Sequence, residues 1–154
     1  MPIMLKLTEH SSTPSAVNFY GIPSNDIYQY WNEVESLIAK GLEYSDGKYE
    51  TWDIFTLIES KQMQLWIITE GERIIACGVT QIVIYPQKKV CLIVLVSGKD
   101  FDRWEHFIKE IRDWARSINC HTIETHGRPG WKKKLKDWTE IHNVLRINID
   151  ESLH

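Results

Sequence analysis

The stretch from Lys89 to Gly98, KVCLIVLVSG, constrains the fold more than any other part of the sequence. Its residues are apolar at consecutive rather than alternate positions, which is typical of a strand covered on both faces. A long amphipathic helix is predicted directly after it, from about 100 to 118, because apolar residues recur there at three- and four-residue spacing. The helix residues expected to face the sheet are Trp104, Phe107, Ile108, Ile111, Trp114 and Ile118.

Two further strands are predicted just before this central strand. QLWIIT and RIIACGVTQIVIYP are separated by Glu70-Gly71-Glu72, which indicates a hairpin, and Pro86-Gln87-Lys88 makes a second turn. Gly78 lies in the middle of a strand, where glycine marks a bulge or the close approach of another backbone. We therefore expect the three strands to be antiparallel in sequence order.

Two helices are predicted upstream of the strands. SNDIYQYWNEVESLIAKG has Ser24 or Asn25 as its N-cap and Gly41 at its end, and TWDIFTLIES has Thr51 as its N-cap. The residues before them show no clear period, and we expect one short strand within residues 3–8.

The C-terminal third is predicted to hold two short strands and a short helix. CHTIETHG is a strand that should lie parallel to KVCLIVLV, because a long helix connects the two. RPGWKKKLKDW is a turn and short helix, and HNVLRINID is a final strand. The expected order is β-α-α-β-β-β-α-β-α-β, which predicts a single α+β domain over residues 1–154.

Composition excludes several classes of function. The net charge is −3, so nothing favours nucleic-acid binding. No apolar run approaches the ~20 residues that a membrane-spanning helix needs, and the N-terminus does not resemble a signal peptide. Three scattered cysteines indicate buried thiols in a reducing compartment, and no pair of histidines has zinc-helix spacing. We expect a cytoplasmic protein without a metal.

The predicted order resembles that of the GNAT superfamily, the acyl-CoA-dependent N-acyltransferases. DWARSINCHTIE is similar to the helix end and fifth strand of these enzymes, and LKDWTEIHNVLRINI to their C-terminal ending. The resemblance implies a central mixed antiparallel and parallel sheet with helices on both faces. GRPGW, at Gly127–Trp131, also resembles an element of small GNAT-like proteins encoded by tailed phages.

The resemblance implies a place for acetyl-CoA. In the family, the fourth strand splays away from the fifth, and the pantetheine arm bonds to exposed backbone of the fourth strand. That strand is VCLIVLVSG in this chain. The pyrophosphate lies on N–H groups at the start of the next helix, within a loop of the form Q/R-x-x-G-x-G/A, because that helix end attracts anions. Leu95 and Val96 would polarise the thioester carbonyl. The implied cofactor-binding residues are Leu95, Val96, Ser97, Gly98, Lys99 and Arg103.

The sequence departs from the family pattern at two places. Asp100, Asp102 and Trp104 stand where the loop has glycines, and the carboxylates repel phosphate. The short helix GWKKKLKDW lacks the tyrosine that protonates the leaving thiolate in many members. The candidates for acid–base chemistry are instead Glu124, His126 at the end of its strand, and Tyr85, a hydroxyl expected near the centre of the sheet.

Two functions remain open at this point. The first is an N-acyltransferase that binds acyl-CoA and an amine. The second is a non-catalytic GNAT-like structural or assembly protein of a phage particle, located in the virion, with protein partners or self-association in place of substrates. In the second case Asp100 caps its own helix and Phe101 blocks the cleft.

Overall fold

The computed structural model describes residues 5–10, 17–98, 104–127 and 135–150, with backbone alone for 5–10 and Trp104. Its strands form one six-stranded sheet in the order β1 to β6. Neighbouring strands are antiparallel except β5 and β6, which are parallel, as predicted. The strands are β1 Leu5–His10, β2 Val17–Ile22, β3 Gln64–Glu70, β4 Arg73–Tyr85, β5 Lys88–Gly98 and β6 Thr122–Thr125.

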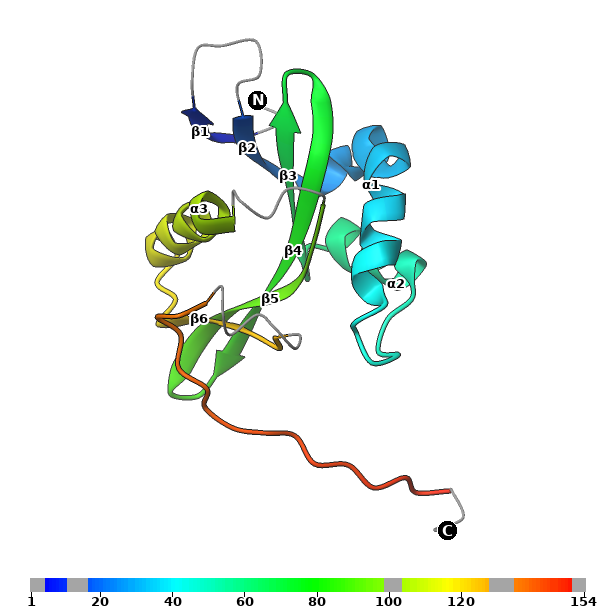
Figure 1. Ribbon diagram of the computed structural model, residues 1–154, viewed down its shortest axis with the longest axis vertical. Helices are drawn as coiled ribbons and strands as arrows, with labels where there is room; N and C mark the ends of the chain where they lie inside the picture. Colours follow the sequence, from blue (N-terminus) through cyan, green and yellow to red (C-terminus); the bar gives the residue numbers. More distant parts are fainter. Residues whose placement is uncertain (1–4, 11–16, 99–103, 128–134, 151–154) are drawn as a thin grey trace.

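Helices cover both faces of the sheet. Helix α1, Ile27–Leu42, and helix α2, Thr51–Glu59, lie on one face, and helix α3, Trp104–Ser117, lies on the other (Figure 1). We call these the α1/α2 face and the α3 face. The arrangement confirms the α+β class with a mixed central sheet that the sequence predicts.

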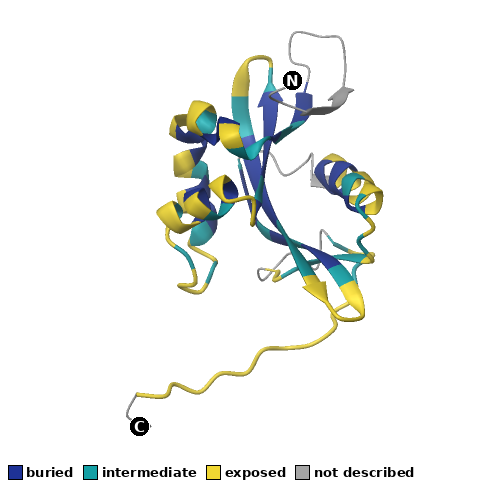
Figure 2. Ribbon diagram, turned by 180° about the vertical axis from the view of Figure 1, so that it is seen from behind, coloured by how far each residue is buried: buried dark blue, intermediate teal, exposed yellow. Residues whose placement is uncertain are grey.

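The core is divided by the sheet into two layers. The middle parts of the central strands between these layers are buried, whereas the tip of the β4–β5 hairpin is exposed (Figure 2). The layer on the α1/α2 face includes Ile27, Val34, Ile38, Ile54, Ile58, Leu65, Ile67, Val79 and Leu95. The layer on the α3 face includes Val17, Phe19, Trp66, Cys91, Ile93, Val96, Phe107, Ile108, Ile111 and Ala115. Because β5 contributes to both layers, its continuous apolar pattern is explained.

Helix α3 presents the face that its period predicts. Phe107, Ile108 and Ile111 are buried, whereas Trp114 is half-buried and meets the Trp66 ring edge-on, with ring centroids 4.8 Å apart. Ile118 is half-buried just after the helix. The side chain of Trp104 lies outside the described residues.

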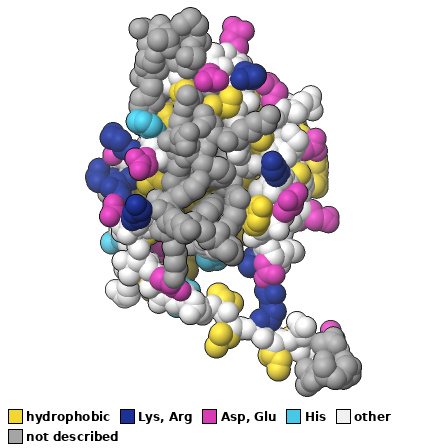
Figure 3. Space-filling model, in the orientation of Figure 1, with side chains coloured by type: hydrophobic (Ala, Val, Ile, Leu, Met, Phe, Trp, Pro, Cys, Tyr) yellow, Lys and Arg dark blue, Asp and Glu magenta, His cyan; other side chains and the backbone are white. Residues whose placement is uncertain are grey.

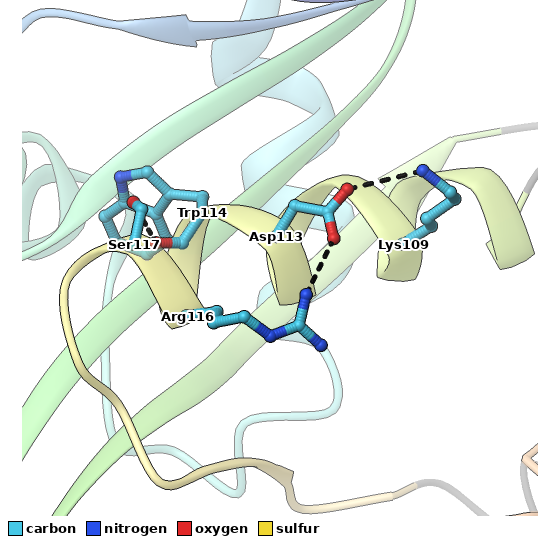
Figure 4. A network of polar contacts seen from close by, with 5 residues as sticks. All are labelled: Lys109, Asp113, Trp114, Arg116 and Ser117. Carbon is cyan, nitrogen blue, oxygen red and sulfur yellow. Dashed lines mark hydrogen bonds and ion pairs between the residues drawn. The ribbon is translucent and has the colours of Figure 1, made fainter.

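The opposite side of α3 carries exposed polar contacts within the helix itself. Asp113 accepts hydrogen bonds from Lys109 Nζ and Arg116 Nη1, each at 3.3 Å, and Ser117 Oγ donates to the carbonyl of Trp114 at 2.6 Å (Figure 4). Such pairs on an exposed helix face each contribute about 0.2–0.5 kcal/mol. The helix is therefore held in place mainly by its apolar side.

The N-terminal region holds two strands instead of the one that we expected. Strand β1 begins at Leu5, and β2 pairs along its whole length with β3. Val17 and Phe19 of β2 pack on the α3 face, while Ile22 packs on the α1/α2 face. A short strand buried on both faces shows no alternation, which is why the sequence pattern did not reveal it.

The helix starts also differ from the prediction. A short 3₁₀ turn, Ser24–Asp26, precedes α1, so Asp26 rather than Ser24 or Asn25 occupies the N-cap. Glu50 rather than Thr51 is the N-cap of α2, and its backbone N–H donates to Asp53 Oδ2 at 2.8 Å. Both helices begin within a few residues of the predicted sites.

The end of the chain contradicts the prediction of a last strand, and the greater part of the predicted last helix lies outside the described residues. Within residues 135–150 there is a turn closed by the Trp138 N–H on the Leu135 carbonyl at 3.1 Å, and then an extended segment without strand pairing. Figure 1 shows this segment, which we call the tail (residues 139–150), running away from the body of the molecule. Its alternating residues have the period of a strand but no neighbouring strand in the described structure.

Candidate functional site

Strand β5 is interrupted by a β-bulge at Val94. On β4, Thr80 pairs with Ile93 and the preceding residue, Val79, pairs with Leu95, so Val94 has no opposite residue. Val94 and Leu95 accordingly both pack on the α1/α2 face. A bulge of this kind bends its strand and increases the local twist.

The bulge lies where β6 stops following β5. The parallel pairing runs from Val90–Thr122 to Ile93–Thr125 and ends there, with the Thr125 hydroxyl donating to the Ile93 carbonyl at 3.1 Å. Beyond this point β5 continues from Val94 to Gly98 beside β4, and no described strand lies along its other edge. We call residues 94–98 the open segment of β5.

Side chains of the open segment are fixed by packing. Leu95 and Ser97 point toward α1, where a Cβ on Gly41 would lie 3.1 Å from Leu95 Cδ1 and 3.4 Å from Ser97 Cβ. Val96 is buried on the opposite, α3 face. The side chains are therefore committed to the core, and the chemistry that this segment offers a ligand comes from its backbone.

Gly98 ends the open segment for a steric reason. A Cβ at this position would lie 2.4 Å from Ala76 Cβ and 2.8 Å from the Ile75 carbonyl oxygen, so only glycine permits this approach of β4 and β5. Ile75 is itself passed over in the pairing of β3 with β4. In the described structure, Gly98 allows β4 and β5 to lie close together at the end of β5.

Glu124 lies on β6 one residue before the strands separate. It pairs with Leu92, and its neighbour Ile123 packs on the α3 face, which places the Glu124 side chain on the α1/α2 face. Its Oε2 atom accepts a hydrogen bond from Thr122 Oγ1 at 3.3 Å and lies 3.9 Å from Lys88 Nζ. The half-buried carboxylate is thus held by two neighbours on the hairpin side of Glu124, since Thr122 pairs with Val90 and Lys88 lies at the tip of the β4–β5 hairpin.

The other two proposed acid–base residues lie at different places along the sheet. His126 is exposed and directly follows β6, beside the opening. Tyr85 is not near the centre of the sheet, as expected, but at the tip of the β4–β5 hairpin, where it pairs with Lys88 and is 54% exposed. At about 3.3 Å per residue, it lies roughly 20 Å along the strand from Leu95. The structure does not bring Tyr85 together with the open segment.

No protein-family model matches the sequence, and no curated protein matches it either. Solved structures do match the fold. A predicted acetyltransferase from Clostridium acetobutylicum with acetyl-CoA has a TM-score of 0.63 at 17% identity, over 90% of this chain and 99% of that one. An aminoglycoside acetyltransferase from an uncultured soil metagenomic sample, in complex with sisomicin, has a TM-score of 0.62 at 9% identity, over 88% of this chain and 97% of that one.

A GNAT family acetyltransferase from Staphylococcus aureus has a TM-score of 0.59 at 7% identity, over 86% of this chain and 98% of that one. This chain has the GNAT acetyltransferase fold. At such low identity the likeness establishes the fold and leaves the activity to be tested. The three similar structures are acetyltransferases, and none of them points to a phage particle.

In the GNAT fold of this chain, β5 corresponds to the fourth strand and β6 to the fifth strand of the family pattern described above. Of the residues that it implied for acetyl-CoA, the open segment contains Leu95, Val96, Ser97 and Gly98. Lys99 and Arg103 lie outside the described residues, as do Asp100, Asp102 and Phe101 and the greater part of GWKKKLKDW. The alternative of a blocked cleft therefore stays a prediction.

Sequence reasoning missed a chain of buried polar groups on the α3 face. Trp66 Nε1 donates to Thr80 Oγ1 at 2.9 Å, and Thr80 Oγ1 donates to Gln64 Oε1 at 2.8 Å. Thr80 is fully buried and pairs with Ile93, next to the bulge. Thr80, a polar residue within an apolar strand, was the only feature of the sequence that indicated this chain.

The bulge at Val94 was also missed, because an apolar pattern on both faces hides a shift of register.

The cysteines are not arranged for nucleophilic catalysis. Burial raises the pKa of Cys77 and of Cys91 to about 12, and the nearby Cys120 adds to the effect at Cys91. A thiol with such a pKa is protonated at neutral pH and is a poor nucleophile.

Among the described residues, no three His, Cys, Asp or Glu side chains gather as metal ligands. No helix in the described part of the chain is long and apolar enough to cross a membrane.

Proposed function

We propose that this protein is an N-acetyltransferase that transfers the acetyl group of acetyl-CoA to a primary amine. The observation that carries the proposal is the departure of β6 from β5 at the Val94 bulge, within a GNAT fold. The departure leaves the edge of β5 from Val94 to Gly98 without a described neighbouring strand. An extended ligand with amide groups, such as the pantetheine arm of CoA, is suited to such an edge because it can add to a sheet as a strand does.

The open segment fits this ligand in shape as well as in chemistry. Its side chains are held in the core, with Leu95 and Ser97 against α1 and Val96 against the α3 layer, so that the backbone is rigid. A preorganised backbone N–H near Leu95 is the type of group that stabilises charge on a thioester oxygen. Lys99 and Arg103 remain our candidates for the phosphates.

The reaction requires a proton acceptor for the amine. The amine nitrogen forms a bond to the thioester carbon, the carbon–sulfur bond breaks, and the nitrogen loses a proton while the sulfur gains one from solvent. Glu124 is the first candidate for the acceptor, because it lies on β6 one residue before the strands separate and its carboxylate contacts Thr122 and Lys88. His126 is the second. Tyr85 is the weakest of the three because of its distance along the hairpin.

Calorimetry with acetyl-CoA tests the proposal at its first step. We expect saturable binding with one site per chain, followed by release of CoA thiol when a primary amine is added. Aminoglycosides and peptides with a free N-terminus provide two different classes of amine for the assay. A protein that neither binds acetyl-CoA nor releases thiol would favour the non-catalytic alternative, a structural or assembly protein.

A pair of substitutions tests the acid–base role. Glu124→Gln keeps the size of the side chain and removes the proton acceptor, so we expect kcat to fall by about 100-fold or more while acetyl-CoA affinity is kept. Glu72→Gln, in the exposed turn between β3 and β4, makes the same chemical change far from β6 and should leave kcat unchanged. Equal activity of the two variants would exclude Glu124 as the acceptor.

The acidic loop can be tested separately. Replacing Asp100 and Asp102 by glycine removes two carboxylates from the sequence position that holds the pyrophosphate loop in the family. If acetyl-CoA binds there, its affinity should increase by roughly fivefold, or about 1 kcal/mol. Unchanged affinity would place the phosphates elsewhere.

A further inference from the structure

Four aromatic rings join α1 to α2 at the surface, and we call them the aromatic cluster (Tyr28, Trp31, Trp52 and Phe55). The Phe55 ring is 4% exposed and meets the rings of Tyr28 and Trp31 edge-on, with centroids 5.3 and 4.9 Å away. The Trp52 ring stacks on Phe55 with a centroid distance of 4.6 Å and an interplanar angle of 7°. Two rings of the cluster stay at the surface, since Tyr28 is 62% and Trp52 is 64% exposed.

The stacking on Phe55 determines how the Trp52 indole is presented. Phe55 lies nearly parallel to the indole and covers one of its two faces, whereas most of the Trp52 side chain is exposed. The face of an aromatic ring attracts cations, and indole does so more strongly than the rings of Tyr or Phe. The outer face of Trp52 is therefore fixed in a position that suits a cation from solvent.

The helices that carry the cluster form the acidic part of the chain. Residues 24–62, which include α1 and α2, contain eight carboxylates, three lysines and no arginine, a charge of −5 against −3 for the whole chain. Acidic side chains gather on the side of the molecule where these helices lie, at the right of Figure 3. One of the eight, Asp46, is paired with Arg146. The surface around the cluster is thus complementary to a basic partner.

Three carboxylates accompany the rings on α2. The Tyr28 hydroxyl donates a hydrogen bond to Glu59 Oε2, which holds this carboxylate at the cluster. Trp52 and Glu59 are seven residues apart on α2. Seven residues are about two helical turns, so both side chains project from the same side of α2, roughly 10 Å apart along its axis. Glu50 and Asp53, which form the capping box, lie on either side of Trp52 in the sequence. Cations can therefore meet carboxylates at both ends of α2.

The exposed rings lie away from the open segment of β5. Gly41, near the end of α1, approaches Leu95 and Ser97 of that segment. Tyr28 precedes Gly41 by thirteen residues of the same helix. At about 1.5 Å per residue, this separation is roughly 20 Å along the axis of α1. A ligand at Tyr28 and Glu59 would not compete with acetyl-CoA for the β5 edge.

We propose that the aromatic cluster is a docking surface for a segment of a partner protein that bears at least two arginines. A guanidinium is planar and weakly hydrated, so it stacks on an indole face, and its fork of N–H groups pairs with carboxylates. The ammonium group of lysine is compact and strongly hydrated, and it gains less from a flat ring. One arginine stacks on Trp52 and a second pairs with Glu59. This surface is independent of the proposed acetyl transfer.

Calorimetry with blocked peptides tests the chemistry of the surface. The probe is the hexapeptide Arg-Gly-Arg-Gly-Arg-Gly, acetylated at its N-terminus and amidated at its C-terminus. It has no primary amine and so cannot be bound as an acetyl acceptor. We expect saturable binding at low salt, about threefold or more tighter than that of the same peptide with lysine in place of arginine. No saturable binding, or equal affinity for the two peptides, would overturn the proposal.

Substitution of the stacked ring locates the surface. Trp52→Ala should weaken binding of the arginine peptide by about threefold or more. The matched control is Tyr85→Ala, which removes a ring that is 54% exposed at the tip of the β4–β5 hairpin and should keep the affinity. Because both side chains are mostly exposed, the circular dichroism of the variants should match that of the original protein. Equal affinity of the two variants would place the peptide elsewhere and contradict the proposal.

Two further measurements test the charge and the identity of the occupant. Glu59→Gln keeps an oxygen for the Tyr28 hydroxyl but removes the charge, so it should weaken binding of the arginine peptide and reduce its dependence on salt. Glu72→Gln makes the same change in the β3–β4 turn and should have no effect. Light scattering then tests for a second copy as occupant. A dimer of the unmodified protein that Trp52→Ala dissociates would assign the surface to self-association and overturn the proposal.

Discussion

At the scale of single residues, the packing of α3 on the sheet limits the size of the side chain at Gly78. Gly78 on β4 lies beneath the Phe107 ring of α3, and a Cβ there would come within 2.5 Å of Phe107 Cζ. The sequence indicated a bulge or the approach of a backbone at Gly78, whereas the structure shows the approach of a side chain. Phe107 is one of the largest fully buried side chains, so this contact determines how close α3 lies to the sheet.

Gly78→Ala should destabilise the fold. The added methyl group overlaps the Phe107 ring, and we expect the free energy of unfolding to fall by about 1–3 kcal/mol. Urea denaturation measures this change. Combining it with Phe107→Leu, which shortens the opposing side chain, should cost less than the sum of the two single changes. Strict additivity would show that the two residues do not compete for the same space.

The thiols differ in reactivity because they differ in burial. Cys77 and Cys91, each with its pKa raised by burial to about 12, should resist iodoacetamide at pH 8 in the folded protein. Cys120 is only partly buried and should be alkylated first, although burial raises its pKa as well. Mass spectrometry of the labelled peptides measures the order. Early labelling of Cys77 would contradict the structure.

The same pKa shifts predict alkaline destabilisation. A folded-state pKa above the ordinary thiol value of 9.0 favours the neutral form in the folded protein. The stability that results is complete below pH 9 and decreases as the pH rises toward 12. Cys77→Ala and Cys91→Ala should therefore flatten the alkaline limb of a plot of stability against pH.

At the scale of elements, α3 shows how far a sequence period can be trusted. The period identified the buried face of the helix correctly, with Ile111 fully buried and Arg112 exposed. The apolar runs of the central strands were identified equally well, because turns at Gly71 and Pro86 bound them. Hydrophobic period and turn residues are local signals, and these elements depend on them.

Ile111→Ala should cost about 2–5 kcal/mol, since it leaves a cavity in the layer between α3 and the sheet. Arg112→Ala, one residue along the same helix, removes an exposed side chain and should change stability by less than about 0.5 kcal/mol. Thermal unfolding of the two variants beside the original protein gives both values. Comparable losses would mean that the helix is rotated from the described position.

Other elements could not be predicted because their formation depends on residues far away in the sequence. Strand β2 exists because β3, more than forty residues later, pairs with all six of its residues. The Val94 bulge depends on the register with β4, which leaves no mark in an apolar strand. The tail has the alternation of a strand without a described partner in its own chain. Of the candidate site, the sequence could therefore indicate the residues of β5 and Glu124, and the family resemblance implied that the two strands separate, but neither could place the separation at the Val94 bulge.

At the scale of the whole molecule, the sheet is an antiparallel meander with one parallel strand added through α3. The proposed site lies where that added strand separates from the meander, between the helical layers. A ligand bound there contacts elements from both halves of the chain. Binding and folding stability should therefore be linked.

Acetyl-CoA should stabilise the protein if the proposed function is correct. At a free concentration about 100 times its Kd, it should add about 2.7 kcal/mol to the free energy of unfolding. Urea denaturation with and without acetyl-CoA measures the effect, and ATP is the control that shares the adenine nucleotide but lacks the pantetheine arm. Equal stabilisation by ATP would indicate recognition of the nucleotide alone.

The order of strands in the sheet has a consequence for synthesis on the ribosome. From β1 to β5, each strand lies beside the strand that precedes it in the chain, so the meander can assemble as it emerges. Helix α3 follows only after β5 is complete. Until it does, Val17, Phe19 and Trp66 on one face of the nascent sheet have no cover. A chaperone that shields apolar surfaces has its clearest opportunity to act on this protein during that interval.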